Sequence, residues 1–461
     1  MGLGRLFGTD GVRGVVNVEL DPLFALKLGY AIGTFFGKGS RILIGRDVRI
    51  GGLMIMRAVE AGLMSAGVKV YEADLITTPA LQHSIRSEGF DGGVMITASH
   101  NPPQYNGIKV LSSQGIEISR DQEREIEEIF FTSRFRKVSW SNIPYDIIKM
   151  EGLIEKYTNW VISLVDKEAI MRKRFTVVID SANSTPSLTT PLVARKLGAK
   201  VVSINSNLDP FFPSRHPEPS PETLKETANI VANIKADIGI AHDADGDRGI
   251  VIDDKGRIHW GDRSAAILAK FLAEKHPELP KKVYTAVSSS ILVEEYLKPF
   301  GIEVVWTKVG SIDISYLMLS QGGGICGFEE NGGFMYPKHL IVRDGTMKLA
   351  LMLELLAHER RKLSEIMDEL PKYYPIKTKI PMKREVALKV VEEIKKIYSN
   401  YRMITIDGIK VFGNDFWFLV RPSGTEPILR IMVEAKDESK AKSIVKELTK
   451  IAKSVAENLE I

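Results

Sequence analysis

Ser99 and His100 stand side by side in the stretch Thr97-Ala-Ser-His-Asn-Pro-Pro103. The apolar run Val94-Met-Ile96 before them predicts the end of a buried strand, and Asn-Pro-Pro can continue neither a helix nor a central strand. We therefore expect both side chains on a loop at the carboxyl end of a strand, the edge of an α/β sheet at which ligands bind. A hydroxyl beside an imidazole is typical of a nucleophile, although the same residues also make an ordinary capped turn.

Three aspartates alternate in Asp243-Ala-Asp-Gly-Asp-Arg248, directly after the apolar run Ile238-Gly-Ile-Ala241. Carboxylates this close repel one another unless a cation gathers them, and their hard oxygens suit Mg²⁺. The loop lacks the distal glutamate of a calcium-binding EF-hand, which argues against a Ca²⁺ sensor. A solvated acidic turn is the alternative, but a strand of the buried type that leads straight into the loop disfavours it.

Three further stretches carry groups that bind anions or sugars. Leu6-Phe-Gly-Thr-Asp-Gly-Val-Arg-Gly14 predicts a tight loop that presents Arg13, either as a surface turn or towards an anion. In Gly327-Phe-Glu-Glu-Asn-Gly-Gly333, polar side chains flanked by glycines could bind sugar hydroxyls. Flexible surface loops have a similar composition, so an ordinary surface loop is the alternative. Arg421-Pro-Ser-Gly-Thr-Glu-Pro427, followed by Arg430, combines backbone N–H groups, hydroxyls and guanidinium groups, which indicates a phosphate cradle or a tight hairpin with about equal weight.

Composition narrows the classes of protein that can carry these stretches. The chain has 461 residues, too many for one core, with 44% hydrophobic and 26% charged residues. A net charge of +4 favours local basic sites over a nucleic-acid-binding surface. We expect no membrane association, because no apolar run is long enough to span a bilayer and no signal-peptide pattern is present. The single cysteine, Cys326, fits a reducing cytoplasm and is expected to be a small core residue.

A strand–helix–strand unit with a glycine at the end of its helix recurs along the chain. Its three copies cover residues 41–71, 175–202 and 283–305, with the glycines at positions 67, 198 and 301. Such units give right-handed crossovers and mostly parallel sheets, although unrelated proteins share them. We therefore predict an α/β protein: three related mixed α/β domains with mostly parallel sheets, plus a smaller C-terminal α+β domain.

The predicted C-terminal domain follows a proline-rich stretch, Pro371 to Pro381, which is interpreted as a linker. After it we expect a helix over 383–398, a hairpin over 402–412 that turns at Asp407-Gly408, strands over 416–420 and 428–434, and a final helix over 438–459. The predicted domains are 1–150 with the serine loop, 151–254 with the aspartate loop, 255–370 with the sugar loop and 371–461 with the phosphate loop. The turn at Asp253-Asp-Lys-Gly256 is taken as the boundary between the second and third.

The five stretches, in this order, resemble those of the α-D-phosphohexomutases, and the resemblance runs from Phe7 to Arg430. The serine loop and the aspartate loop together carry most of its specificity. Residues 7–14 look most like the form of this motif found in phosphoglucosamine mutases. The sugar loop departs from many relatives, which have Glu-x-Ser-Gly-His there. Here Asn331 replaces the serine and Gly333 the histidine, a form similar to archaeal members, some of which accept several sugars.

The resemblance implies an isomerase that interconverts hexose 1-phosphates and 6-phosphates through a phosphoserine and a hexose 1,6-bisphosphate. It implies catalytic roles for Ser99, His100, Lys109 and Arg13, and a Mg²⁺ ion held by Ser99, Asp243, Asp245 and Asp247. It implies substrate contacts from Arg248, Glu329 and Asn331, and phosphate contacts from Arg421, Ser423, Gly424, Thr425 and Arg430. For proton transfer Lys109 and His100 are both kept, while Arg13 is assigned to charge stabilisation, because its pKa of about 12 or more makes it a poor base.

Glucosamine phosphate is the expected substrate, and a phosphomannomutase/phosphoglucomutase of the same family is the alternative. A homodimer is kept open. Two more distant readings are a non-catalytic sugar-phosphate-binding protein and a phosphatase, which would lose the phosphoserine to water. A protein that only binds would not need a phosphorylatable serine beside three aspartates and a lysine.

Overall fold

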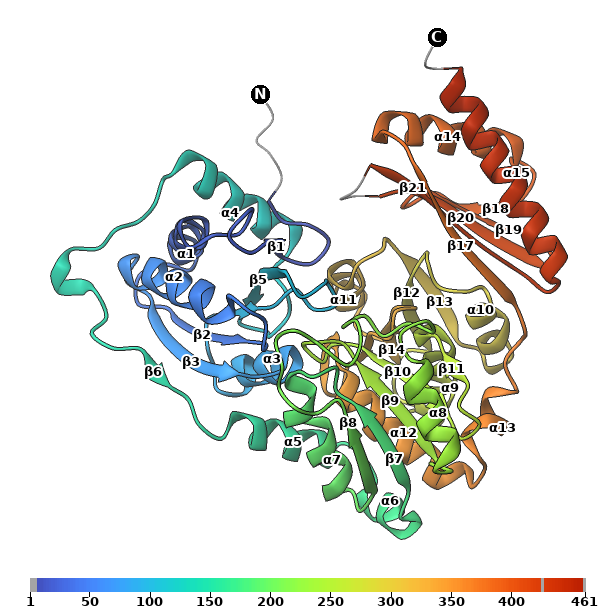
Figure 1. The fold of residues 1–461 in the computed structure, drawn as a ribbon, viewed down its shortest axis with the longest axis horizontal. Helices are drawn as coiled ribbons and strands as arrows, with labels where there is room; N and C mark the ends of the chain where they lie inside the picture. Colours follow the sequence, from blue (N-terminus) through green and yellow to red (C-terminus); the bar gives the residue numbers. More distant parts are fainter. Residues whose placement is uncertain (1–5, 424–426, 459–461) are drawn as a thin grey trace. The chain divides into compact units, whose positions relative to one another are not determined.

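The structure is a computed structural model that describes residues 6–423 and 427–458. The chain forms two compact units (Figure 1). The first unit consists of Met1–Ser264 and Asn331–Ile366, and the second of Ala265–Glu330 and Met367–Ile461. Two helices, α9 (Gly261–Lys275) and α13 (Leu363–Met367), contain residues of both units.

The first unit begins with a six-stranded mixed sheet in the order β1-β5-β4-β2-β3-β6. Its strands are β1 (Val12–Val15), β2 (Arg41–Arg46), β3 (Lys69–Leu75), β4 (Gly92–Ile96), β5 (Tyr105–Ser112) and β6 (Ile148–Lys149). Its helices are α1 (Pro22–Phe36), α2 (Gly52–Ser65), α3 (Thr78–Ser87) and α4 (Arg120–Thr132). β5 runs antiparallel to both β1 and β4, whereas the pairs of β2 with β3, β2 with β4 and β3 with β6 are parallel.

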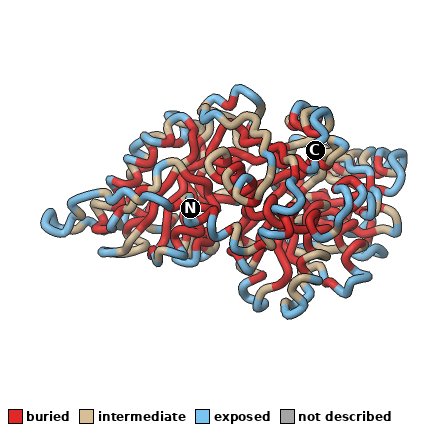
Figure 2. The backbone as a smooth tube through the Cα atoms, turned by 90° about the horizontal axis from the view of Figure 1, so that it is seen from below, coloured by how far each residue is buried: buried red, intermediate tan, exposed pale blue. Residues whose placement is uncertain are grey.

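Strand β2 is buried on both faces because helices cover each of them. Ile42 and Ile44 belong to the core that also contains side chains of α1, α2 and α4. On the opposite face Gly45 leaves room for the chain around α3: a Cβ there would lie 2.5 Å from Ile76 and 3.2 Å from Leu81. Figure 2 shows such buried segments in red. A strand covered on both faces is read from the sequence as a continuous apolar run, as it is here.

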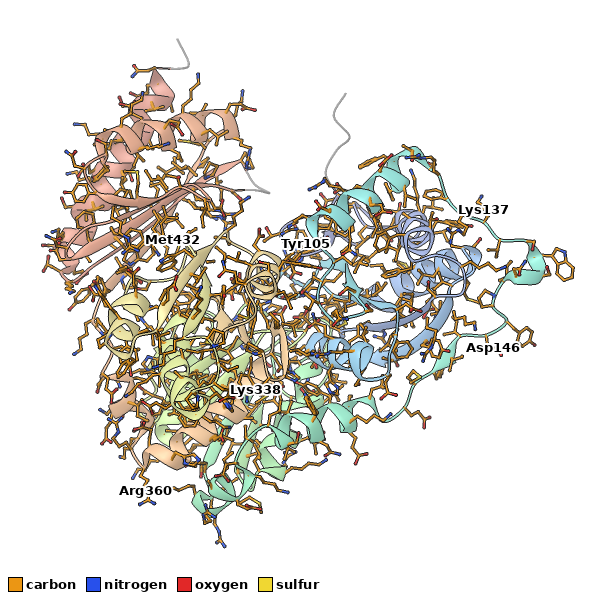
Figure 3. All side chains as sticks on the ribbon, turned by 180° about the vertical axis from the view of Figure 1, so that it is seen from behind. Tyr105, Lys137, Asp146, Lys338, Arg360 and Met432 are labelled. Carbon is orange, nitrogen blue, oxygen red and sulfur yellow. The ribbon has the colours of Figure 1, made fainter. Side chains whose placement is uncertain are left out.

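The segment between α4 and α5 (Leu153–Ser163) is largely exposed. It passes through the short helix η1 (Trp140–Asn142) and returns to the sheet as β6. Lys137 and Asp146 lie on this segment in Figure 3, and Trp140 and Tyr145 are 88% and 94% exposed. This segment therefore contributes an edge strand to the first sheet.

A second, five-stranded sheet in the first unit has the order β11-β10-β9-β7-β8. Its strands are β7 (Thr176–Asp180), β8 (Lys200–Ile204), β9 (Ile238–His242), β10 (Gly249–Asp253) and β11 (Ile258–His259). The helices of this region are α5 (Leu153–Ser163), α6 (Lys167–Lys173), η2 (Thr185–Leu188), α7 (Thr190–Lys196) and α8 (Lys225–Asn233). The predicted turn after Asp253 joins β10 to β11 as a hairpin of this sheet.

Residues 331–366 complete the first unit. They form an antiparallel hairpin of β15 (Phe334–Tyr336) and β16 (Leu340–Arg343), followed by α12 (Gly345–Glu359). Asp344 caps α12, because its Oδ1 accepts a hydrogen bond of 2.9 Å from the Met347 backbone N–H. The cap fixes the point at which the hairpin turns into the helix, and with it the position of Arg343.

The second unit contains three parallel strands with β12 in the middle. They are β12 (Lys282–Ala286), β13 (Glu303–Thr307) and β14 (Cys326–Phe328). The helices that connect them are α10 (Leu292–Leu297), η3 (Lys298–Phe300) and α11 (Ser311–Ser320). Cys326 is fully buried, which confirms the prediction that it is a core residue.

The C-terminal sheet of the second unit is antiparallel throughout, in the order β17-β21-β20-β19-β18. Its strands are β17 (Tyr374–Pro381), β18 (Arg402–Ile404), β19 (Ile409–Phe412), β20 (Phe416–Pro422) and β21 (Ile428–Ala435). Helices α14 (Arg384–Ile397) and α15 (Glu438–Glu457) share a core with its strands. The predicted hairpin with its turn at Asp407-Gly408 is confirmed.

The prediction of a linker over Pro371 to Pro381 is wrong for most of that stretch. Residues 374–381 form β17, which pairs with β21 along its whole length. Ile376 and Ile380 alternate with exposed lysines and pack against the core of this domain. The prolines obscured this alternation, but β17 is an edge strand, where a missing N–H costs no ladder hydrogen bond.

The expected fold class is confirmed: mixed α/β sheets with helices and a small C-terminal α+β domain. Gly67, Gly198 and Gly301 each follow a helix with φ of +84°, +82° and +70°, the left-handed conformation that a glycine at this position supplies. Among the described residues, no helix combines the length and apolar character needed to cross a bilayer.

Candidate active site

Ser99 lies where the sequence predicts it, on the loop between the carboxyl end of β4 and the start of β5. Its side chain is buried, with 1% of the residue exposed, and its backbone adopts φ = +51°. The Ser99 hydroxyl donates a hydrogen bond of 2.5 Å to Asp243 Oδ2 and lies 3.4 Å from His100 Nδ1. The first two motifs, 144 residues apart in sequence, therefore meet through a direct side-chain contact.

The three aspartates occupy the loop between β9 and β10 and are essentially fully buried. One oxygen from each lies within 4.8 Å of the others. Asp243 Oδ1 accepts from the Arg248 backbone N–H, and Asp245 Oδ2 accepts from the Thr78 hydroxyl at 2.7 Å. Among the described residues, Oδ1 of Asp245 and Oδ1 of Asp247 have no hydrogen-bond partner.

This arrangement fits a bound divalent cation. Burial first, and then repulsion by Asp245 and Asp247, raises the pKa of the Asp243 carboxyl well above its usual range. Buried carboxylate oxygens without partners are costly unless a cation or a donor reaches them. The donor set consists of carboxylate oxygens and a serine hydroxyl, the hard ligands that Mg²⁺ and similar ions prefer. The group is therefore suited to metal binding.

Lys109, on β5, is placed between carboxylates. Its ammonium nitrogen lies 3.1 Å from Asp10, 3.0 Å from Asp245 and 3.1 Å from Asp247. Burial alone would lower the pKa of Lys109, but these carboxylates outweigh it and raise that pKa. Burial would likewise raise the pKa of Asp10, yet Lys109 and Arg343 hold it well below its usual range. Lys109 is thus a cation in this arrangement.

Arg343, at the end of β16, completes a ring of opposite charges with Lys109. Its Nη2 donates to Oδ2 of Asp10 at 2.9 Å and to Oδ2 of Asp247, and Lys109 contacts the same two oxygens. Two cations therefore occupy the Oδ2 side of Asp247, while Oδ1 is left for another ligand.

The backbone around Arg343 is fixed against the aspartate loop. The Gly345 N–H donates to the Gly246 carbonyl, and the Gly249 N–H donates to the Gly332 carbonyl, both at 3.1 Å. A Cβ at Gly345 would lie 2.4 Å from the Arg248 carbonyl oxygen, so only glycine allows this approach. Residues 332–345 thus brace the aspartate loop and deliver Arg343 to it.

Sequence reasoning missed Arg343 and gave no role to Asp10. Asp10 lies inside the amino-terminal motif, so its carboxylate was a signal that could have been used. Arg343 had no such signal, because nothing near it in sequence suggests that it reaches residues 96 and 333 positions away.

The other predicted catalytic residues of the first unit lie in the same cluster. Arg13 donates to Asn101 Oδ1 at 2.5 Å and to Asp10 Oδ2 at 3.1 Å. Burial, followed by Arg248 and Arg13, lowers the pKa of His100 well below its usual value. Arg248 is 6% exposed. The structure therefore brings Ser99, His100, Lys109, Arg13, the three aspartates and Arg248 into one buried centre.

The predicted sugar-reading residues Glu329 and Asn331 belong to different units. Glu329 follows β14 in the second unit and is 4% exposed. Asn331 begins the returning segment of the first unit, and its Oδ1 accepts a hydrogen bond of 3.2 Å from the Gly333 N–H.

The predicted phosphate loop lies in the second unit. Arg421 and Arg430 are directly opposite each other in the antiparallel pair of β20 and β21. Arg421 Nε donates to Asp407 Oδ2 at 2.7 Å, and the Ser423 N–H donates to the Ile428 carbonyl at 2.9 Å. Gly424 and Thr425 lie outside the described residues. Two guanidinium groups therefore stand opposite each other in this sheet, and Asp407 is an ion-pair partner of Arg421.

Comparison with protein families matches four domain descriptions in order along the chain. They are phosphoglucomutase/phosphomannomutase alpha/beta/alpha domain I at residues 4–137, domain II at 155–256, domain III at 260–374 and the C-terminal domain at 376–451.

Individual relatives agree with these matches over nearly the whole chain. The chain is 54% identical to a phosphoglucosamine/phosphogalactosamine mutase of Sulfurisphaera tokodaii, over 97% of this chain and 99% of that protein. It is 41% identical to a phosphoglucomutase/phosphomannomutase of Thermococcus kodakarensis, over 95% of this chain and 96% of that protein. A phosphoglucomutase/phosphomannomutase family protein of Burkholderia thailandensis shares the fold, with a TM-score of 0.85, 23% identity and coverage of 98% of this chain and 97% of that one.

Proposed function

We propose that this chain, which belongs to the phosphoglucomutase/phosphomannomutase family, converts glucosamine 6-phosphate to glucosamine 1-phosphate by way of a phosphoserine at Ser99. As a member of that family it is a phosphohexomutase, an isomerase that moves phosphate within a hexose phosphate. The observation that carries the serine assignment is the buried Ser99 hydroxyl bonded to Asp243 of the aspartate triad.

The proposed reaction has two phosphoryl transfers. In the first, the bond between phosphorus and Ser99 Oγ breaks as a bond forms to the free hydroxyl oxygen of the sugar phosphate. The proton of that hydroxyl is given up and Ser99 Oγ gains one, and the product is a hexose 1,6-bisphosphate. The sugar then turns over. In the second, the bond between phosphorus and the sugar oxygen at the other end breaks as a bond forms to Ser99 Oγ. Ser99 Oγ gives up its proton, the sugar oxygen gains one, and the isomeric monophosphate leaves. The phosphoserine is restored, so no phosphate is consumed.

Ser99, Asp243, Asp245 and Asp247 would hold one Mg²⁺. Its partners would include the two Oδ1 atoms that have none among the described residues. When bound, Mg²⁺ neutralises charge on the phosphoryl oxygens during transfer. Arg343 and Lys109 keep the opposite oxygen of Asp247 engaged and so orient this carboxylate.

Proton transfer involves the two candidates differently. Lys109 has three N–H donors, and three carboxylates lie within 3.1 Å of its nitrogen. That geometry makes Lys109 a counter-ion for the aspartates. His100 Nδ1 is the ring nitrogen beside Ser99 Oγ, at 3.4 Å, and is placed to exchange a proton with a hydroxyl at that position. Arg13, fixed by Asp10 and Asn101, supplies positive charge.

The second unit would recognise the parts of the substrate that do not react. Glu329, with Asn331 of the first unit, would read sugar hydroxyls. Arg421, Ser423, Gly424, Thr425 and Arg430 would bind the phosphate that is not being transferred. The same contacts serve both half-reactions, because each orientation of the sugar leaves one phosphate away from Ser99.

The preference for glucosamine rests on two observations. Residues 7–14 have the form seen in phosphoglucosamine mutases, and the relative at 54% identity is named for glucosamine and galactosamine phosphates. A phosphomannomutase/phosphoglucomutase is the alternative, supported by the name of the relative at 41% identity and by the Asn331/Gly333 form of the sugar loop.

A substrate panel tests this assignment. Glucosamine, galactosamine, glucose and mannose phosphates are compared by kcat/KM at equal bisphosphate activator. We expect glucosamine phosphate to be preferred over mannose phosphate. A preference for mannose phosphate of more than about tenfold, or ~1.4 kcal/mol of transition-state discrimination, would overturn it. Intact mass for one phosphate on the enzyme, with a coupled assay of isomer formation and phosphate release, separates a mutase from a binding protein and from a phosphatase.

A further inference from the structure

The Ser99 loop folds around the guanidinium group of Arg49. Arg49 lies between β2 and α2, and its side chain is completely buried. Its Nη2 donates to the carbonyls of Ser99 at 2.7 Å and Asn101 at 2.8 Å. Its Nη1 donates to the carbonyls of Pro102 at 2.8 Å and Tyr105 at 3.2 Å. Tyr105 is labelled in Figure 3, at the start of β5.

Every donor of this guanidinium has an acceptor. The fifth N–H, on Nε, donates to Asp47 Oδ2 at 3.2 Å, which also supplies the compensating charge. The ring of Phe212 covers the group, with its centroid 4.9 Å from Arg49 Cζ. Four backbone carbonyls of one loop on a single side chain fix the path of that loop from Ser99 to Tyr105.

The backbone N–H of Ser99 is also held by hydrogen bonds. The Ser99 N–H donates to the Thr97 hydroxyl at 2.8 Å, and that hydroxyl donates to Asp47 Oδ2 at 2.6 Å. Asp47 therefore joins two paths, one through Thr97 to the Ser99 N–H and one through Arg49 to the Ser99 carbonyl.

Ser99 needs these hydrogen bonds because its backbone is strained. A φ of +51° is the left-handed region, which non-glycine residues adopt only when the surroundings determine it. The strained conformation points the hydroxyl at Asp243. Without its carbonyl and amide partners, the loop would relax towards ordinary backbone angles and move the hydroxyl away.

We propose that Arg49 is the positioning residue for the phosphoserine, and that its guanidinium holds Ser99 in line with the aspartate triad during phosphoryl transfer. The proposal deepens the proposed function and rests on it. It requires a guanidinium group, because the three tetrahedral donors of a lysine cannot reach four carbonyls and a carboxylate arranged around a planar fork.

The test compares Arg49→Lys and Arg49→Ala with Arg57→Ala in the full-length enzyme. Arg57 is a control from α2 of the same domain. Its side chain is 47% exposed, pairs with two buried carboxylates, Glu60 and Glu72, and has no contact with the Ser99 loop among its described interactions. All three variants should unfold at a lower temperature than the wild type. Activity is measured well below those temperatures, after circular dichroism has verified folding.

We expect Arg49→Lys to lower kcat roughly 10- to 100-fold, the effect of a misplaced reacting group, with KM changed less than about twofold. Transfer of phosphate from hexose 1,6-bisphosphate to Ser99, followed by intact mass, should slow by a similar factor. Hydrogen exchange should increase in the peptide that covers residues 97–105. Guanidinium ion at millimolar concentration should restore part of the kcat that Arg49→Ala loses. The same addition should not raise the kcat of Arg57→Ala.

The outcomes separate this inference from the proposed function. If wild-type Ser99 carries phosphate and turns over but the Arg49 variants behave like Arg57→Ala, Arg49 is only structural and the inference is overturned. If Arg49→Ala does not fold, Arg49→Lys and Thr97→Val, which breaks the second path to Ser99, decide by the same kcat and exchange measurements. A wild-type enzyme with no phosphate on Ser99 would overturn the proposed function and the inference together.

Discussion

The aspartate centre of the first unit and the phosphate loop of the second are both charged, but they are built in opposite ways. In the first, Asp243, Asp245, Asp247 and Lys109 are at most 1% exposed, and most of their charged atoms already have partners. In the second, Arg421 remains 14% exposed in its side chain and pairs with Asp407 through Nε. The centre that would carry out the transfer is organised before substrate arrives, whereas the cradle would be completed by the phosphate it binds.

The difference has a physical reason. A transferring phosphoryl group needs fixed cations and dipoles, because reorganising them during the reaction would add to its barrier. A cradle that holds the other phosphate must also release a bisphosphate so that the sugar can turn, and a preformed buried cage would hold it too long. We therefore expect substitutions in the aspartate centre to impair the transfer itself or the binding of its cation, and substitutions in the cradle to impair the hold on substrate and bisphosphate.

Ser99→Ala should have the largest effect. Without the hydroxyl there is no acceptor for the returning phosphate, so turnover should fall by several orders of magnitude while the fold is kept. Steady-state assays and intact mass check this. His358→Gln, at a half-exposed site, is the control for handling and expression. Near-normal activity in the Ser99→Ala protein would remove the serine from the mechanism.

Asp245→Asn should follow. The change removes one charge from the cation site and one of the three carboxylates around Lys109. The Mg²⁺ concentration for half-maximal activity should rise by roughly tenfold or more. Titration with Mg²⁺ measures it, and calorimetry on the substrate-free protein gives metal affinity without activity. Asp121→Asn, whose side chain is 83% exposed on α4, is the control. An unchanged curve for Asp245→Asn would mean that the cation binds elsewhere.

Arg421→Ala should reduce kcat/KM roughly 10- to 150-fold, because it removes a charge-assisted contact worth about 1.5–3 kcal/mol. Ser99 should remain phosphorylated, and more bisphosphate should escape per turnover. Arg402→Ala is a suitable control, since Arg402 also pairs with a carboxylate of the second unit, Glu294, but on an exposed surface. If bisphosphate release is unchanged, Arg421 only recruits substrate.

The same contrast explains what the sequence could predict. Ser99 and the aspartates stand in short motifs at strand ends, and Lys109 lies inside the strand that follows the serine loop, so residue type and local order are enough to identify them. Arg49 and Arg343 act through contacts that only the fold creates, with carbonyls 50–56 positions away and carboxylates 96 and 333 positions away. No local pattern encodes such contacts.

Strand β17 shows the opposite error. Its prolines are typical of a linker, and local reasoning gave them more weight than the alternation of Ile376, Thr378 and Ile380. The sheet decides otherwise, because β21 supplies a partner for the whole strand and helices cover its apolar face. The prolines do favour an irregular segment locally, but pairing with β21 outweighs that preference.

The smallest expected effect concerns the buried support of Arg343. His83, on α3, is 8% exposed and packs against the rings of His339, Trp160 and Tyr157 at 5.9–6.1 Å. His339 Nε2 and the Tyr157 hydroxyl donate to Asp344, the residue that follows Arg343. This aromatic group therefore holds the strand end that delivers Arg343 to the aspartate centre.

Burial, and then the charge of His339, lowers the pKa of His83 from 6.5 to about 4. Above pH 6.5 both the folded and the unfolded chain keep this histidine neutral. As the pH falls from 6.5 towards 4, only the unfolded chain binds the proton, so folding stability is lost across that window and levels off below it. Between pH 7 and pH 5 the loss amounts to about 2 kcal/mol from this group, a few degrees of thermal midpoint.

His83→Gln should flatten the dependence of the midpoint on pH in this range, with His358→Gln as the exposed control. His242, whose pKa is also lowered to about 4, should leave part of the slope in place. If the thermal midpoint depends on pH equally in the wild type and in His83→Gln, protonation of His83 does not weaken the first unit. The contrast between the aspartate centre and the phosphate loop would then rest on the aspartates and Lys109 alone.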